Sequence, residues 1–154
     1  MDLYNDIEYV RSLIVSHGTN PINRINQEEL KDNSKHLVAK TVTASCTDDI
    51  TLVLWLKNNK VVDAKFYGFG CVISTATTDM FCTDIVNKDL DEVQKLTKSY
   101  LDMITNGEIK NKTLLNDLIV YKNVHKQANR IPCAQSCALS INKVIKDYKE
   151  NENI

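Results

Sequence analysis

The chain has 154 residues and a mass of 17.5 kDa, which suits one domain with its own hydrophobic core. Its 19 basic and 20 acidic residues give a net charge of −1, which argues against nucleic acid or an anionic membrane surface as the main partner. No stretch approaches the ~20 apolar residues of a membrane span, and the start of the chain lacks the features of a signal peptide. We therefore expect a cytoplasmic protein.

The first part of the chain predicts a helix, a turn and a polar connection. Residues 3–17 carry apolar side chains at helical spacing and predict an amphipathic helix that ends near Gly18: Leu3, Ile7, Val10, Leu13 and Ile14. Pro21 predicts a turn over residues 20–23, because proline disfavours a helical residue before it. Residues 26–35 are polar and predict an exposed connection.

The next segment has the pattern of a small antiparallel sheet. A strand predicted at 38–43 leads into a polar turn that contains Cys46. Alternating side chains predict strands at 51–57 and 61–67, and Asn58-Asn59 predicts the tight turn between them. In such a sheet, only the face covered by helices needs to be strongly apolar.

After Cys71 the apolar side chains recur with the helical period. We predict helices at about 72–86 and 89–105, an ill-defined short helix within 108–124, and a last helix from Cys133 to about Lys149. Residues 150–154 are predicted to be a frayed tail. The expected fold is one α+β domain over residues 1–154, with a small three-stranded antiparallel sheet packed on one side by about four to five helices.

Three of the five cysteines occupy comparable places at the ends of predicted elements. Cys46 lies in a turn between strands, Cys71 lies between a strand and a helix, and Cys133 opens the last helix. Together with Asp48 they could hold zinc in a tetrahedral site, or an iron–sulfur cluster. Their wide spacing equally allows buried cysteines without a ligand. An odd number of cysteines favours metal or redox chemistry over a disulfide framework.

Four motifs together resemble the SufU/IscU/NifU-N family of iron–sulfur cluster assembly proteins. They are Cys46-Thr47-Asp48, the segment from Asp63 to Cys71 that ends in Gly68-Phe69-Gly70-Cys71, Ile73-Ser74-Thr75-Ala76-Thr77, and Arg130-Ile131-Pro132-Cys133-Ala134. The resemblance covers about residues 3–147. It implies a metal site formed by Cys46, Asp48, Cys71 and Cys133.

Two details resemble the SufU branch more than the IscU branch. Pro132 stands where IscU-like scaffolds have a histidine, and the 62-residue interval from Cys71 to Cys133 matches the longer SufU version. The SufU resemblance implies bound zinc and a SufS-like cysteine desulfurase as partner. The IscU alternative implies a scaffold that passes an iron–sulfur cluster to downstream assembly or acceptor proteins, and a structural zinc domain is the third alternative.

The resemblance also implies roles for individual residues. Cys46 would accept persulfide sulfur from the desulfurase, and Arg130 would help the desulfurase to dock. Thr47 departs from the family, which usually has glycine there, and a β-branched residue suits a positive φ poorly. If Thr47 distorts the loop, Asp49 is the alternative ligand to Asp48.

The remaining cysteines and the histidines are interpreted as structural. Cys82 falls within a predicted helix, and Cys137 lies one turn after Cys133 on the same helix face, so packing explains both. His17, His36 and His125 match no ligand position of the family. We expect them to be surface residues or to be satisfied by hydrogen bonds.

Overall fold

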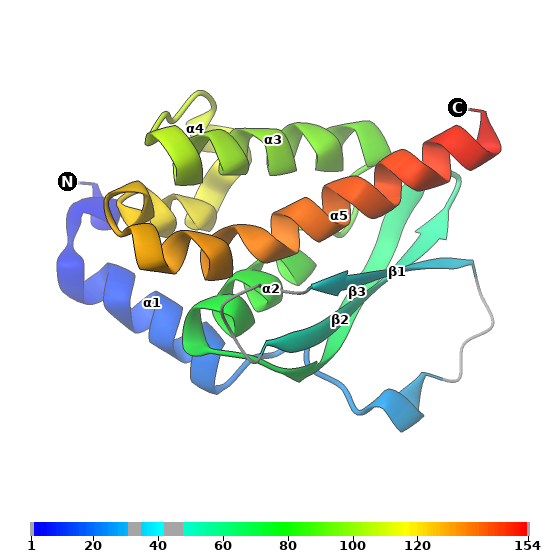
Figure 1. The fold of residues 1–154 in the computed structure, drawn as a ribbon, viewed down its shortest axis with the longest axis horizontal. Coiled ribbons are helices and arrows are strands. Elements are labelled where there is room, and N and C mark those ends of the chain that lie inside the picture. The colour runs from blue at the N-terminus through cyan, green and yellow to red at the C-terminus, as the bar shows by residue number, and fades with distance from the viewer. Residues whose placement is uncertain (1, 31–34, 42–47, 154) are drawn as a thin grey trace.

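The computed structural model describes residues 2–30, 35–41 and 48–153. Three antiparallel strands form a sheet in the order β1-β2-β3: β1 (His36–Thr41), β2 (Asp49–Lys57) and β3 (Lys60–Phe69). The α-helices are α1 (Ile7–Thr19), α2 (Val72–Ile85), α3 (Leu90–Asn106), α4 (Lys112–Leu115) and α5 (Ile131–Glu152). The predicted α+β architecture is confirmed (Figure 1).

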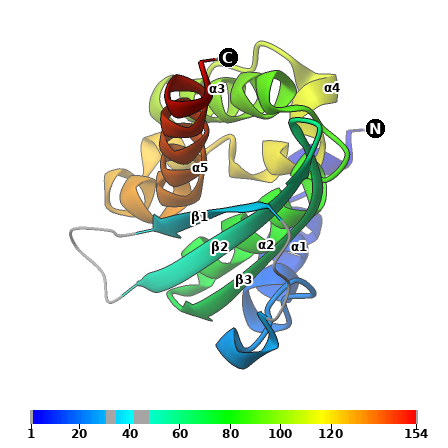
Figure 2. The same cartoon turned by 90° about the vertical axis from the view of Figure 1, so that its right-hand side faces the viewer.

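The helices cover one side of the sheet in two tiers. α2 packs against β3 and α5 against β1, while α1 packs on α2 and α3 packs on α5 (Figure 2). The core between sheet and helices consists of fully buried side chains that include Leu52, Leu54, Phe66, Phe81, Leu96 and Ile141. None of the described helices is long and apolar enough to cross a lipid bilayer.

The tight turn between β2 and β3 forms where it was predicted. Lys57 pairs with Lys60, so that only Asn58 and Asn59 connect the strands. Both asparagines have positive φ, 54° and 59°, a region that asparagine tolerates better than most residues. This turn sets the register that brings the start of β2 beside the end of β3.

The central strand is buried on both faces, although only the face toward the helices was expected to need burial. Val53, on the face away from the helices, is only 1% exposed. On this face Thr51, Val53 and Trp55 pair with Lys40, Val38 and His36 on β1 and with Tyr67, Lys65 and Asp63 on β3. The middle strand is therefore flanked by a paired side chain on either side at each of these positions.

The first helix begins later than predicted. Residues 3–5 form a 3₁₀ turn, η1 (Leu3–Asn5), and α1 starts only at Ile7. The Asp6 carboxylate accepts from the N–H groups of Glu8 and Tyr9 at 3.0 and 3.2 Å, which defines the helix start. Leu3 and Ile7 consequently lie on the surface, with exposures of 55% and 75%.

A buried polar cluster fixes α1 against α2. The Asp79 carboxylate of α2 lies 2.6 Å from His17 Nδ1 of α1 and accepts from the Asn23 backbone N–H at 2.9 Å. The connection that follows runs beside β3, since Ile25 N–H donates to Phe66 O at 2.8 Å. Beyond it, residues 26–29 are exposed as predicted and include a 3₁₀ turn, η2 (Gln27–Glu29).

The second half of the chain follows the prediction except in two segments. α3 starts at a capping box made by Asp89 and Glu92 and ends at Gly107, with φ of 72°. The short helix predicted within 108–124 is confirmed only as α4 (Lys112–Leu115), and three 3₁₀ turns follow it: η3 (Asn116–Tyr121), η4 (Val124–Lys126) and η5 (Ala128–Arg130). α5 extends to Glu152, so the frayed tail predicted from Glu150 is wrong for residues 150–152.

Candidate metal centre

Three of the four predicted ligands meet at one end of the sheet. Asp48 directly precedes β2, Cys71 lies between β3 and α2, and Cys133 is in the first turn of α5. One ligand atom from each lies within 4.8 Å of the others. Cys46 and Thr47 fall outside the described residues, so the place of Cys46 in this cluster stays a prediction.

Two glycines allow the loop after β3 to approach the start of β2. Gly68 has a φ of +99°, and a Cβ there would lie 2.1 Å from the Asp49 carbonyl oxygen. At Gly70 a Cβ would lie 2.8 Å from Asp48 Oδ1. Side chains at these two positions would push Cys71 away from Asp48, which explains the glycines on either side of Phe69.

Hydrogen bonds hold the Asp48 carboxylate in one orientation. The Cys71 backbone N–H donates to Asp48 Oδ1 at 2.7 Å, and the Ser74 hydroxyl donates to Oδ2. Asp48 is 7% exposed and Ser74 is fully buried. The carboxylate is therefore held from two sides by the start of α2, in the way that hydrogen bonds from neighbouring groups orient metal ligands.

The start of α2 also positions the sulfur of Cys71. Cys71 is the N-cap residue of α2, and the Ser74 backbone N–H donates to its Sγ at 3.4 Å. The positive end of a helix dipole favours negative charge on a group in this place. Ser74 thus contacts Asp48 and Cys71, and its hydroxyl also donates to the Cys133 carbonyl oxygen at 3.4 Å, a role that the sequence motif alone did not reveal.

The donor set fits a cation. Two thiols and a carboxylate lie together, and Asp48 and Cys133 are buried, with exposures of 7% and 6%. Like charges at such separations repel strongly away from water, and a bound cation removes that cost. Sulfur and carboxylate ligands in this combination suit zinc, with one further position for a fourth ligand.

Asp49 does not join the cluster in place of Asp48. Its carboxylate is exposed and lies 3.8 Å from Lys40 Nζ. The alternative ligand considered for a distorted loop is therefore wrong for this structure. Asp48, which directly follows Thr47 in the sequence, lies in the cluster instead.

The other cysteines in the described part of the chain belong to the core. Cys82 and Cys137 are fully buried, and neither forms a disulfide. Burial raises the pKa of the Cys82 thiol well above its ordinary value and that of Cys137 to about 12. Their complete burial within the hydrophobic core agrees with the packing interpretation.

The histidines lie away from the cluster, as expected. His17 is bound to Asp79, and His125 Nδ1 lies 2.8 Å from the Lys122 carbonyl oxygen. His36 lies beside Trp55, with ring centroids 6.4 Å apart. None of the three is part of the Asp48–Cys71–Cys133 group.

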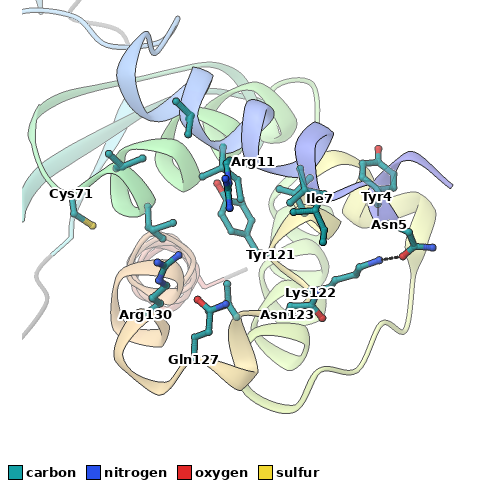
Figure 3. A pocket seen from close by; sticks show the side chains of 17 residues that line it. Tyr4, Asn5, Ile7, Arg11, Cys71, Tyr121, Lys122, Asn123, Gln127 and Arg130 are labelled. Carbon is teal, nitrogen blue, oxygen red and sulfur yellow. Dashed lines mark hydrogen bonds between the residues drawn. The ribbon is translucent and has the colours of Figure 1, made fainter.

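Arg130 occupies an exposed position at the start of α5, three residues before Cys133. It lines a surface groove together with Cys71 (Figure 3). Its guanidinium is therefore available to a partner that approaches the metal centre. The docking role itself stays a prediction.

Two relatives of known description align with half or more of this chain. The zinc-dependent sulfurtransferase SufU of Bacillus subtilis is 33% identical over 124 residues, which cover 80% of each chain. The iron–sulfur cluster assembly scaffold protein IscU of Thermotoga maritima is 37% identical over 82 residues, 50% of this chain and 58% of the relative.

Solved structures share the fold at lower identity. A protein described as an iron–sulfur cluster assembly scaffold for the SUF system, from Fervidobacterium islandicum AW-1, superposes with a TM-score of 0.76 at 24% identity and covers 86% of this chain and 93% of its own. The N-terminal part of a nitrogen-fixing NifU-like protein from Brucella abortus gives 0.78 at 15% identity, with coverage of 97% and 99%. A family model for the NifU-like N terminal domain matches residues 9–154. Sequence and fold together place the chain in the NifU-like N-terminal domain family, alongside these SufU and IscU relatives.

Proposed function

We propose that this protein is a zinc-binding sulfur-transfer protein of iron–sulfur cluster assembly, which accepts persulfide sulfur from a cysteine desulfurase. The observation that carries the proposal is the Asp48–Cys71–Cys133 cluster, whose ligand atoms lie within 4.8 Å of one another. The similarity to a relative named zinc-dependent sulfurtransferase SufU supports it.

Four residues would hold the metal: Cys71, Cys133 and Asp48 from the described cluster, and Cys46 as the predicted fourth ligand. When bound, zinc would keep the thiols deprotonated and protect them from oxidation. The Ser74 hydroxyl and the Cys71 N–H keep the Asp48 carboxylate aimed at the cluster. Cys71 and Cys133 are fixed at helix starts and serve as holding ligands.

Cys46 is the proposed sulfur acceptor. Its thiolate attacks the terminal sulfur of the persulfide on the desulfurase, and a new S–S bond forms at Cys46. The S–S bond of the donor breaks at the same time, and the donor cysteine leaves as a thiolate. Electrons and atoms balance without any added oxidant or reductant. Arg130 would help to hold the desulfurase during this exchange.

Metal analysis combined with a desulfurase assay tests the proposal. Purified wild type should contain about one zinc per chain and should stimulate sulfide release from cysteine by the organism's own desulfurase. Cys46→Ala should abolish the stimulation, whereas Cys82→Ala, which removes a core cysteine outside the cluster, should retain it. A metal-free wild type without effect on the desulfurase would refute the proposal.

A second candidate function uses the same ligands to assemble an iron–sulfur cluster. Two thiols and a carboxylate in one site suit such a cluster as well as zinc, and the IscU relative is described as a scaffold. Anaerobic reconstitution with iron and sulfide would then give a chromophore that an apo-acceptor protein takes up. A purely structural zinc site, by contrast, predicts that Cys46→Ala lowers thermal stability without a specific loss of sulfur acceptance.

A further inference from the structure

A groove of about 850 Å³ opens beside the metal centre (Figure 3). It runs between α1, the start of α2 and the 3₁₀ turns η3 to η5. Apolar side chains along it are left largely in water: Ile7, Val15 and Val72 are 75%, 45% and 44% exposed. Apolar surface of this kind, gathered along one concave face, is typical of a binding site.

The rim of the groove is cationic. Arg11 from α1, Lys122 at the end of η3 and Arg130 before α5 all line it, and none of the described lining residues is an aspartate or glutamate. Within the described part of the chain, none of these three cations takes part in an ion pair. Lys122 Nζ donates to the side-chain oxygen of Asn5, which is a neutral group (Figure 3).

This local charge contrasts with the whole chain, whose net charge is −1. Uncompensated guanidinium groups bind carboxylates in preference to neutral groups, because each offers a planar set of N–H donors. Apolar side chains next to arginine are also common at the centre of protein–protein interfaces. The groove is therefore complementary to an apolar segment with acidic side chains.

The groove ends at the metal centre. Cys71 lines it directly, and Arg130 lies three residues before Cys133. A protein seated there would lie beside Cys71. The sulfur donor must bring an anionic persulfide to this place, which a cationic rim favours.

We infer that this groove receives an apolar, acidic segment of the sulfur-donor protein, with Arg11 and Lys122 as docking residues in addition to Arg130. The inference rests on the proposed function and adds to it the surface and the chemistry of the partner. Docking through the groove would place the donor on the Cys71 side of the metal centre.

Charge reversal at the rim tests the inference. Arg11→Glu and Lys122→Glu should each raise the dissociation constant for the organism's own desulfurase by about tenfold or more, mainly through slower association. Both should retain the wild-type zinc content, because neither side chain belongs to the cluster. Lys98→Glu, an exposed lysine on α3 outside the groove, is the matched control and should bind as wild type does.

The apolar part of the groove has its own test. Val15→Ser should weaken binding several-fold, whereas Leu139→Ser should not, since both residues are similarly exposed (45% and 46%) but only Val15 lines the groove. Added salt should weaken wild-type binding and affect Arg11→Glu less. The apolar variants and the salt dependence therefore separate the apolar from the charged contribution to desulfurase binding.

The outcomes separate this inference from the proposed function. If wild type accepts sulfur while Arg11→Glu, Lys122→Glu and Val15→Ser all bind the desulfurase as wild type does, the groove is not the docking surface and the function stands. If the groove variants bind the donor normally but fail to pass sulfur to an apo-acceptor protein, the groove serves the acceptor and the inference is overturned. If wild type accepts sulfur from no desulfurase, the proposed function itself fails.

Discussion

Ser74 connects the two halves of the candidate metal centre. Its hydroxyl donates to the Asp48 carboxylate before β2, and its backbone N–H donates to the sulfur of Cys71 at the start of α2. The side chain is fully buried, so water cannot replace its hydrogen bond. Residues that orient metal ligands in this way commonly affect affinity nearly as strongly as the ligands do.

Ser74→Ala should therefore bind zinc about 10- to 100-fold more weakly than wild type. The Asp48 carboxylate would lose one of its two orienting donors, while the thiols would remain in place. Competition with a chromogenic chelator measures the change. Ser140→Ala removes a hydroxyl bound to the Cys137 carbonyl outside the cluster and should leave zinc affinity unchanged. Equal affinities for both variants would contradict the role of Ser74.

The environment of Asp84 predicts that this residue makes the stability of the protein depend on pH. One oxygen of its carboxylate, Oδ2, is buried without a hydrogen-bond partner among the described residues, and Asp84 lies at the C-terminal end of α2. Burial raises its pKa from 3.8 to about 6, although the charge of Lys88 acts in the opposite direction. The ionised form therefore costs free energy in the folded state.

Since the folded pKa is raised, the contribution of Asp84 is favourable below about pH 4 and is lost as the pH rises through about 6. Asp84→Asn should be more stable than wild type at pH 8, by on the order of 2 kcal/mol, and no more stable at pH 4. Urea unfolding at both pH values measures the difference. A pH-independent effect of Asp84→Asn would contradict the explanation.

Among the secondary-structure elements, the junction between β3 and α2 positions the candidate metal centre. Gly70 allows the loop to lie against Asp48, since a Cβ there would come within 2.8 Å of Asp48 Oδ1 and 2.9 Å of Ile50 Cδ1. Both atoms are ends of side chains that can move. A larger residue at position 70 would therefore displace the Asp48 carboxylate rather than unfold the domain.

Gly70→Ala is expected to lower zinc affinity by about tenfold at a stability cost on the order of 1 kcal/mol. Gly107→Ala provides the converse control. Its φ of +72° and its contact with His125 make an added Cβ costly for the fold, but it lies at the end of α3 away from the cluster. In zinc titration and thermal unfolding, Gly70→Ala should therefore mainly lower the zinc affinity, whereas Gly107→Ala should mainly lower the unfolding temperature. Wild-type zinc affinity in Gly70→Ala would contradict this role of Gly70.

The elements that sequence reasoning predicted well are those with a clear period and clear ends. α3 has a capping box at Asp89 and a glycine at its end, and the β2–β3 turn has two asparagines. The 3₁₀ turns at 116–130 are too short to show a period, so they could not be separated from a helix. The start of α1 was missed because the Asp6 cap outweighed the apolar residues before it.

At the scale of the whole molecule, the metal centre joins residues far apart in the chain. The three candidate ligands are Asp48, Cys71 and Cys133. They come together because the start of β2, the junction of β3 with α2 and the start of α5 lie at the same end of the molecule. Their spacing alone left a buried-cysteine explanation open, and the family motifs favoured the metal site. The groove could not be predicted at all, because it depends on how α1 packs beside the 3₁₀ turns.

Bound zinc should stabilise the whole domain, because the ligands lie on elements that separate when the chain unfolds. At a free zinc concentration 100 times the dissociation constant, the gain is about 2.7 kcal/mol, which raises the unfolding midpoint by several degrees. Scanning calorimetry before and after a chelator measures it. Cys133→Ser should lose the response to zinc. An unchanged midpoint in wild type would show that zinc does not bind the folded cluster.

The most direct test of the central claim follows sulfur from the donor to this protein in a single turnover. Zinc-loaded wild type and Cys46→Ala are each mixed anaerobically with persulfidated desulfurase and then analysed by intact-protein mass and peptide mapping. We expect a gain of one sulfur atom in wild type, located at Cys46, and no gain in Cys46→Ala. Wild type without added sulfur, or sulfur that reaches Cys46→Ala at the wild-type rate, would contradict it.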